Sequence, residues 1–93
     1  MMYLILSEMD PSLAPKDPEE RKKIPEMIKK DLDSGELKMA GWSPDGRNSF
    51  VVTTQDEKTI LTRSMMFSPE IKFKVMPMLS YDEFMDVVKE MQP

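Results

Sequence analysis

The chain has 93 residues, a formal net charge of -4, 40% hydrophobic residues and 32% charged residues. These values indicate one globular domain spanning 1–93, and the acidic balance argues against nucleic acid and anionic membranes as partners. Cysteine and histidine are both absent, which excludes disulfides, the usual Cys/His zinc sites, and Ser-His or Cys-His nucleophiles.

The apolar runs are shorter than the ~18 residues of a membrane span. The first residues lack a basic leader and a small-residue cleavage site, so we expect a cytoplasmic protein without a signal peptide. Neither a metal nor a cofactor is expected. There are eleven methionines, and we expect them to fill the core, because Met27, Met65 and Met91 lie among apolar residues at helical spacing.

The first half of the chain predicts a strand, a helix and a hairpin. Residues 2–9 carry apolar side chains at both parities, as a central strand covered on both faces does. Asp17 and Pro18 suit the start of a helix, Gly35 suits its end, and Pro25 predicts a kink or a later start. Residues 36–42 and 48–54 predict a β-hairpin closed by "SPDG".

The second half predicts a helix, a strand and a last helix. Thr54 and Glu57 form a potential capping box for a helix that "FSPE" ends. Residues 70–78 alternate apolar and polar side chains, which is typical of a strand with one buried face. Ser80 and Glu83 form a second potential capping box, which opens a helix with an apolar stripe at Tyr81, Phe84, Val88 and Met91.

The order β-α-β-β-α-β with a C-terminal helix predicts an α+β, ferredoxin-like fold with a four-stranded antiparallel sheet. The stretch "SGELKMAGWSPDGRNSFVVTTQDEKTILTRSMMFSPEIKFKVMPML" resembles the dimeric α/β-barrel proteins, in particular the muconolactone isomerase-like and YCII-related groups. The matching elements are Gly35, Gly41-Trp42, Gly46, Thr54 to Glu57, Pro69 and Val75 to Leu79. The resemblance implies a homodimer, and an isomerase or other enzyme acting on a small organic acid or lactone. Because the chain has no histidine, the His-Asp pair of several YCII-related proteins is not carried over.

A few residues are candidates for chemistry. Glu8 ends the first strand, and Lys72 and Lys74 lie on the last strand, its expected neighbour. These three could form a proton-transferring pair in a cleft at the sheet face, although a cross-strand ion pair is the plainer interpretation. Candidate ligand-binding residues are Tyr3, Trp42 and Arg47.

Two functional hypotheses remain open from the sequence. The chain binds or isomerises a small molecule in a cleft at the sheet face, or it is a non-catalytic oligomeric module on the same fold. RNA-binding RRM domains share the topology and place aromatics on the first and third strands. Tyr3 and Phe50 occupy those strands, but the acidic charge and the sequence around Phe50 disfavour RNA.

Self-association is the expected partnership. Apolar side chains occur on both faces of every long strand, and two crossover helices cover only one face of the sheet. The other face would expose more apolar surface than monomers usually do. A homodimer or higher homo-oligomer is therefore predicted, with Trp42 at the rim of the contact.

Overall fold

The computed structural model describes residues 2–13, 16–67 and 70–92. Its strands and helices follow the order β1-α1-β2-β3-α2-β4-α3, with a short 3-10 turn (Pro11–Leu13) after β1. The strands are β1 (Met2–Met9), β2 (Leu37–Trp42), β3 (Asn48–Thr53) and β4 (Ile71–Met78), and the helices are α1 (Pro18–Ser34), α2 (Glu57–Met66) and α3 (Tyr81–Met91). The predicted ferredoxin-like α+β fold is confirmed.

The four strands form one antiparallel sheet in the order β2-β3-β1-β4. The strand β1 lies inside the sheet, as its apolar residues at both parities predicted. Ile5 pairs with Val51 on one side and with Val75 on the other. These pairings determine which side chains share a face, because successive residues of a strand point to opposite sides.

Local signals define the helix ends. The Asp17 side chain accepts a hydrogen bond from the Glu19 backbone N–H at 3.0 Å, and Gly35 ends α1 with a φ of 85°. The helix α1 runs from Pro18 through Pro25 without a later start. The capping box of Ser80 and Glu83 at the start of α3 is confirmed.

Two sequence predictions concern the second helix and its surroundings. The capping box of Thr54 and Glu57 is wrong, because Asp56 caps α2 and accepts from the Thr59 N–H at 2.8 Å. An aspartate one residue before the first helical position competes well with threonine as a cap. Pro69, expected in the segment that ends the helix, lies outside the described residues.

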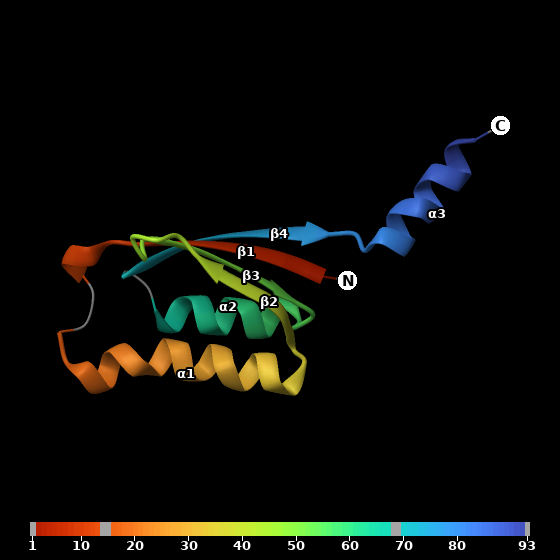
Figure 1. Ribbon diagram of the computed structural model, residues 1–93. Coiled ribbons are helices and arrows are strands. Elements are labelled where there is room, and N and C mark those ends of the chain that lie inside the picture. The colour runs from red at the N-terminus through yellow and green to blue at the C-terminus, as the bar shows by residue number, and fades with distance from the viewer. Residues whose placement is uncertain (1, 14–15, 68–69, 93) are drawn as a thin grey trace.

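The helices α1 and α2 lie side by side on one face of the sheet (Figure 1). Between the layers, Tyr3, Ile5 and Ile60 form a buried cluster, against which Val51 and Phe73 pack. Leu37 is also buried. Few side chains in the described part of the chain are fully buried, so the two layers are loosely packed in places.

The side of the sheet that faces away from these two helices is termed the open face. By strand register it carries eight apolar side chains: Met2, Leu4, Leu6, Met39, Phe50, Val52, Met76 and Met78. Glu8, Lys72 and Lys74 share this face. Figure 1 shows that neither α1 nor α2 covers it. The Phe50 ring lies over Gly41, where an added Cβ would be 2.4 Å from Cε1 of the ring.

The helix α3 does not cover the open face either. It continues beyond the end of β4 and projects away from the sheet (Figure 1), which makes the molecule 59 Å long but only 26 and 25 Å across. The expected core position of the methionines is wrong for Met65 and Met91, which are 68% and 79% exposed. Both lie on helix faces that no neighbouring layer of the described chain covers.

The register also bears on the RNA-binding alternative. Tyr3 pairs with Thr53 and is buried towards the helices, whereas Phe50 pairs with Leu6 on the open face. Two aromatics on opposite faces cannot form a common stacking platform for bases. Separately, no helix within the described ranges is long and apolar enough to span a membrane.

Candidate functional site

A cavity of about 270 Å³ lies between the sheet and the helices α1 and α2. Its apolar lining residues are Ile5, Met9, Ile24, Pro25, Met27, Ile28, Leu37, Trp42, Val51, Ile60, Phe67, Ile71 and Phe73. Several of these residues would form the core of a tightly packed domain, but Ile28, Val51 and Phe73 are only half-buried because the cavity separates the two layers. The volume is close to the lower limit of ~300 Å³ for small-molecule sites.

One end of the cavity is formed where several elements begin or end. Met9 ends β1, Trp42 ends β2, Arg47 immediately precedes β3, and Phe67 follows α2. These residues lie at the same end of the sheet because the strands are antiparallel. Trp42 is 55% exposed, so its indole forms part of the cavity mouth and is accessible to solvent.

Arginine is concentrated around this cavity. The chain has three arginines and ten lysines. Arg21, Arg47 and Arg63 all line the cavity, and among the described lysines none does. The one carboxylate among the described lining residues is that of Asp31. Three cations and one anion give the lining a net charge of +2 in a protein with a net charge of -4.

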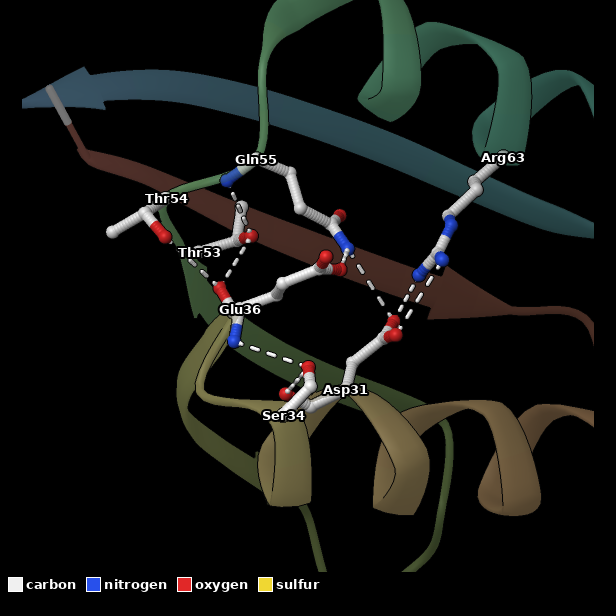
Figure 2. A network of polar contacts seen from close by, with 7 residues as sticks. All are labelled: Asp31, Ser34, Glu36, Thr53, Thr54, Gln55 and Arg63. Atoms are coloured by element: carbon white, nitrogen blue, oxygen red, sulfur yellow. Dashed lines mark hydrogen bonds and ion pairs between the residues drawn. The ribbon is translucent and has the colours of Figure 1, made fainter.

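A partly buried ion pair lines the cavity, between the two helices. Figure 2 shows Arg63 reaching from α2 to Asp31 on α1. The guanidinium donates from Nη1 to Oδ2 and from Nη2 to Oδ1, the second contact at 3.4 Å. The Asp31 side chain is 6% exposed and that of Arg63 is 31% exposed. The pair therefore joins α1 to α2 across the cavity wall.

Gln55 extends this ion pair into a network. Its Nε2 donates to Asp31 Oδ2 at 3.4 Å and to Glu36 Oε2 at 3.0 Å. Its backbone N–H donates to Oγ1 of the buried Thr53, and that hydroxyl donates to the Glu36 carbonyl, each at 3.0 Å. The network links the segment between α1 and β2 to the segment between β3 and α2 (Figure 2).

The sequence candidates for proton transfer lie elsewhere. Glu8 and Lys72 are direct partners across β1 and β4, as their expected strand adjacency requires, and Lys74 is opposite Leu6. All three share the open face, so they lie across the sheet from the cavity. Among the described residues, no ion pair within 4.0 Å joins Glu8 to either lysine. This geometry fits a structural cross-strand pair on a half-solvated surface.

A second hollow of about 220 Å³ lies at the end of the β1–β4 pair, lined by Glu8, Met9, Asp10, Pro11, Arg47, Glu70 and Lys72. Hydrogen bonds from the Ser12 side chain and backbone N–H lower the pKa of Asp10. The polar side chains that line this hollow carry mixed charge. No group of three potential ligands in the described ranges could hold a metal ion.

The three candidate ligand-binding residues do not all lie at one site in the structure. Trp42 and Arg47 line the cavity mouth. Trp42 pairs with Ser49 on the helix-covered side of the sheet, which differs from the expected position at the rim of a dimer contact. Tyr3 is not among the described residues lining the cavity. Its hydroxyl donates to Glu57 Oε1 at 2.7 Å, and this hydrogen bond raises the pKa of Tyr3 above its ordinary value.

Asp31 and Gln55 of the cavity wall were not among the sequence candidates, although one signal was present for Asp31. Asp31 follows Ile24 by seven residues and Ile28 by three, so it shares their helical face. A carboxylate on an apolar stripe that becomes buried requires a partner. Gln55 and Arg63 carried no comparable signal, because their proximity to Asp31 depends on how α1 and α2 pack.

The fold and the cavity define a ferredoxin-like α+β domain with an arginine-lined apolar cavity between its two layers. A scan against models of known protein families finds no match, and a search of curated proteins finds no significant relative. The resemblance to the dimeric α/β-barrel proteins therefore stays a prediction.

Proposed function

We propose that the protein binds a small molecule with an apolar body and an anionic head in the cavity between the sheet and the helices α1 and α2. The observation that carries this proposal is the placement of arginine. All three arginines of the chain line one apolar cavity, whereas the described lysines lie elsewhere. If both residue types served only to keep the surface solvated, there would be no reason for arginine and lysine to occupy different places.

The chemistry of arginine favours a carboxylate or a phosphate as the head group. The planar guanidinium donates two parallel hydrogen bonds to these anions and is more weakly hydrated than an ammonium group. Arg63 already pairs with Asp31, so we place the anionic head at the mouth, beside Arg47. The apolar body then lies along Ile5, Val51 and their neighbours.

Binding is better supported than isomerisation. An acid/base catalyst must lie within hydrogen-bond reach of the proton it moves. Asp31 is the one carboxylate among the described lining residues, and its oxygens accept from Arg63 and Gln55. Glu8, Lys72 and Lys74 lie across the sheet from the cavity. The ligand classes remain those that the sequence suggested, small organic acids ahead of lactones.

The test is a thermal-shift and fluorescence titration with three eight-carbon probes: octanoate, octanol and octylamine. A ligand that binds only the folded state stabilises it by about 2.7 kcal/mol at a concentration of 100 Kd. Octanoate should raise the melting temperature and change the emission of Trp42, the only tryptophan. Octanol should act weakly, and octylamine should have no effect because it places a cation beside arginines.

Variants at the mouth give the matched comparison. Arg47→Gln should weaken octanoate binding by about tenfold, since a charge-assisted hydrogen bond at an exposed site contributes about 1.5 kcal/mol. Lys30→Gln removes an equal charge from the exposed surface of α1 outside this cavity and should leave the affinity unchanged. Equal shifts with all three probes, or equal losses in both variants, would contradict the proposal.

A further inference from the structure

Two apolar surfaces of this chain are uncovered, and they lie on different elements. One is the open face of the sheet, where Leu6, Met39 and Met78 are 39%, 57% and 41% exposed. The other is the stripe of α3, where Tyr81 and Phe84 are 74% and 53% exposed. Exposed aromatic and aliphatic surface of this extent is typical of a site that binds another protein surface.

We propose that α3 of one copy packs on the open face of a second copy, while the second copy returns its own α3 to the first. The result is a two-fold dimer with exchanged C-terminal helices. This inference is independent of the ligand proposed for the cavity, because the open face and the cavity lie on opposite sides of the sheet.

The link between β4 and α3 is the first argument for exchange. Only Leu79 and Ser80 separate Met78, the last residue of β4, from Tyr81. Ser80 is held in the capping box, with its N–H donating to Glu83 at 3.0 Å and its Oγ accepting from the Glu83 N–H at 3.1 Å. The helix therefore leaves along the direction of β4, away from its own sheet (Figure 1).

The dimensions of the two surfaces match. An α-helix of the 11 residues of α3 is ~16 Å long at a rise of ~1.5 Å per residue. Four strands at ~4.8 Å spacing place the outer strands ~14 Å apart. One helix thus spans the width of the sheet and can cover the apolar side chains in the middle of the open face, such as Leu6 and Phe50.

Charge favours the helix over a second sheet as the cover. Lys74 lies opposite Leu6 on the open face, halfway along the edge strand β4. Face-to-face stacking of two identical sheets would bring Lys72 and Lys74 of both copies to one largely apolar interface, which is unfavourable unless each ammonium group finds a partner. The helix α3 instead carries four acidic residues and one lysine: Asp82, Glu83, Asp86, Glu90 and Lys89. A docked α3 therefore brings negative charge to a face that holds Lys72 and Lys74.

Reciprocal exchange closes the assembly at two copies. Each copy supplies one helix and one face, so a reciprocal exchange uses both surfaces and leaves neither for a third copy. A one-way exchange would instead close into a ring of three or more copies or continue into a filament. We therefore expect a dimer of twice the 10.8 kDa chain mass.

Cross-linking tests the contact directly, because the chain contains no cysteine. Leu6→Cys places a thiol on the open face, and Val88→Cys places one on the apolar stripe of α3. A short bismaleimide is the reagent, since packed side chains hold the two backbones further apart than the ~7 Å that a disulfide spans. When the two variants are mixed, one with a longer tag, the mixed Leu6→Cys/Val88→Cys product should dominate. Lys89→Cys, on the polar side of α3, should cross-link poorly to Leu6→Cys.

Sedimentation equilibrium supplies the second measurement. Phe84→Glu should raise the dimer dissociation constant at least about thirtyfold, as expected for a central interface aromatic. Asp86→Ala, on the polar side, should change it less than about threefold. Because Phe84 lies outside the buried core, circular dichroism of the Phe84→Glu variant should still show a folded domain.

Three results would overturn the proposal. Dominant cross-linking between two Leu6→Cys chains would indicate stacked sheets, and dominant cross-linking between two Val88→Cys chains would indicate paired helices. A monomer at micromolar concentration would remove the partner altogether. None of these results bears on octanoate binding, so a failure of the exchanged dimer is distinguishable from a failure of the proposed ligand site.

Discussion

Replacing Arg63 with methionine removes one partner of the ion pair that joins α1 to α2. Methionine keeps most of the length and apolar bulk of the arginine stem. The Asp31 carboxylate, 6% exposed, would lose both hydrogen bonds from the guanidinium and keep the weaker one from Gln55 at 3.4 Å. Removing one member of a buried pair typically destabilises a protein by about 3–5 kcal/mol.

The two partners should respond unequally, because their burial differs. Asp31→Asn leaves Arg63 with an amide oxygen to donate to and with a guanidinium that is 31% exposed, so we expect a loss of about 1–2 kcal/mol. The double variant Asp31→Leu/Arg63→Met removes both charges together. Replacing a buried pair by apolar residues is often neutral, so this variant should be more stable than Arg63→Met alone.

Urea denaturation measures these differences. Circular dichroism and Trp42 fluorescence should give coincident transitions, from which the free energy of unfolding in water is obtained by linear extrapolation. The control is Lys23→Met, which breaks the exposed pair of Lys23 and Glu20 at 2.8 Å. The midpoint of this control should hardly move, since solvent screens such pairs.

Two results would refute this reasoning. If Arg63→Met lowered the free energy of unfolding by less than about 1 kcal/mol, the carboxylate would not depend on its partner in the way that buried charges do. If the double variant were as unstable as Arg63→Met, the loss would come from the packing of Arg63 and not from an unpaired charge.

Three further predictions concern single positions. Gly41→Ala should lower the free energy of unfolding by about 1–3 kcal/mol, because its Cβ would meet the Phe50 ring at 2.4 Å; urea titration should show the loss disappearing in a Phe50→Ala background. Gly35→Ala should cost about 1 kcal/mol in the same assay, because its φ of 85° disfavours any Cβ, and a stabilising effect would be inconsistent with that conformation. The hydrogen bond to Glu57 raises the pKa of Tyr3 above 10.0, so the folded state binds this proton more tightly and the free energy of unfolding should fall as the pH rises above about 10. Tyr3→Phe should flatten that alkaline slope, and an unchanged slope would assign it to other groups.

The helix ends and the hairpin were predictable because their causes are local. Ser80 and Glu83 exchange hydrogen bonds within one turn, and Asp17 binds the second residue after it. Gly35 adopts a positive φ that other residues avoid. The failure at Thr54 has the same local origin, since Asp56 offered a competing cap two residues further along. Alternation along single strands, together with these signals, was sufficient for the order of the elements and hence for the fold class.

The sequence by itself determined the elements, their order and their apolar faces, because those depend on hydrogen bonds and side-chain periods within a few residues. The tertiary structure alone decided that Arg21, Arg47 and Arg63 line one cavity, that Trp42 lies on the helix-covered side, and that Glu8 lies on the other. The face of each strand residue depends on pairing between distant strands, and a slip of one residue exchanges the two faces. Likewise, the contact of Arg63 with Asp31 joins residues 32 positions apart, and only the packing of α1 beside α2 brings them together.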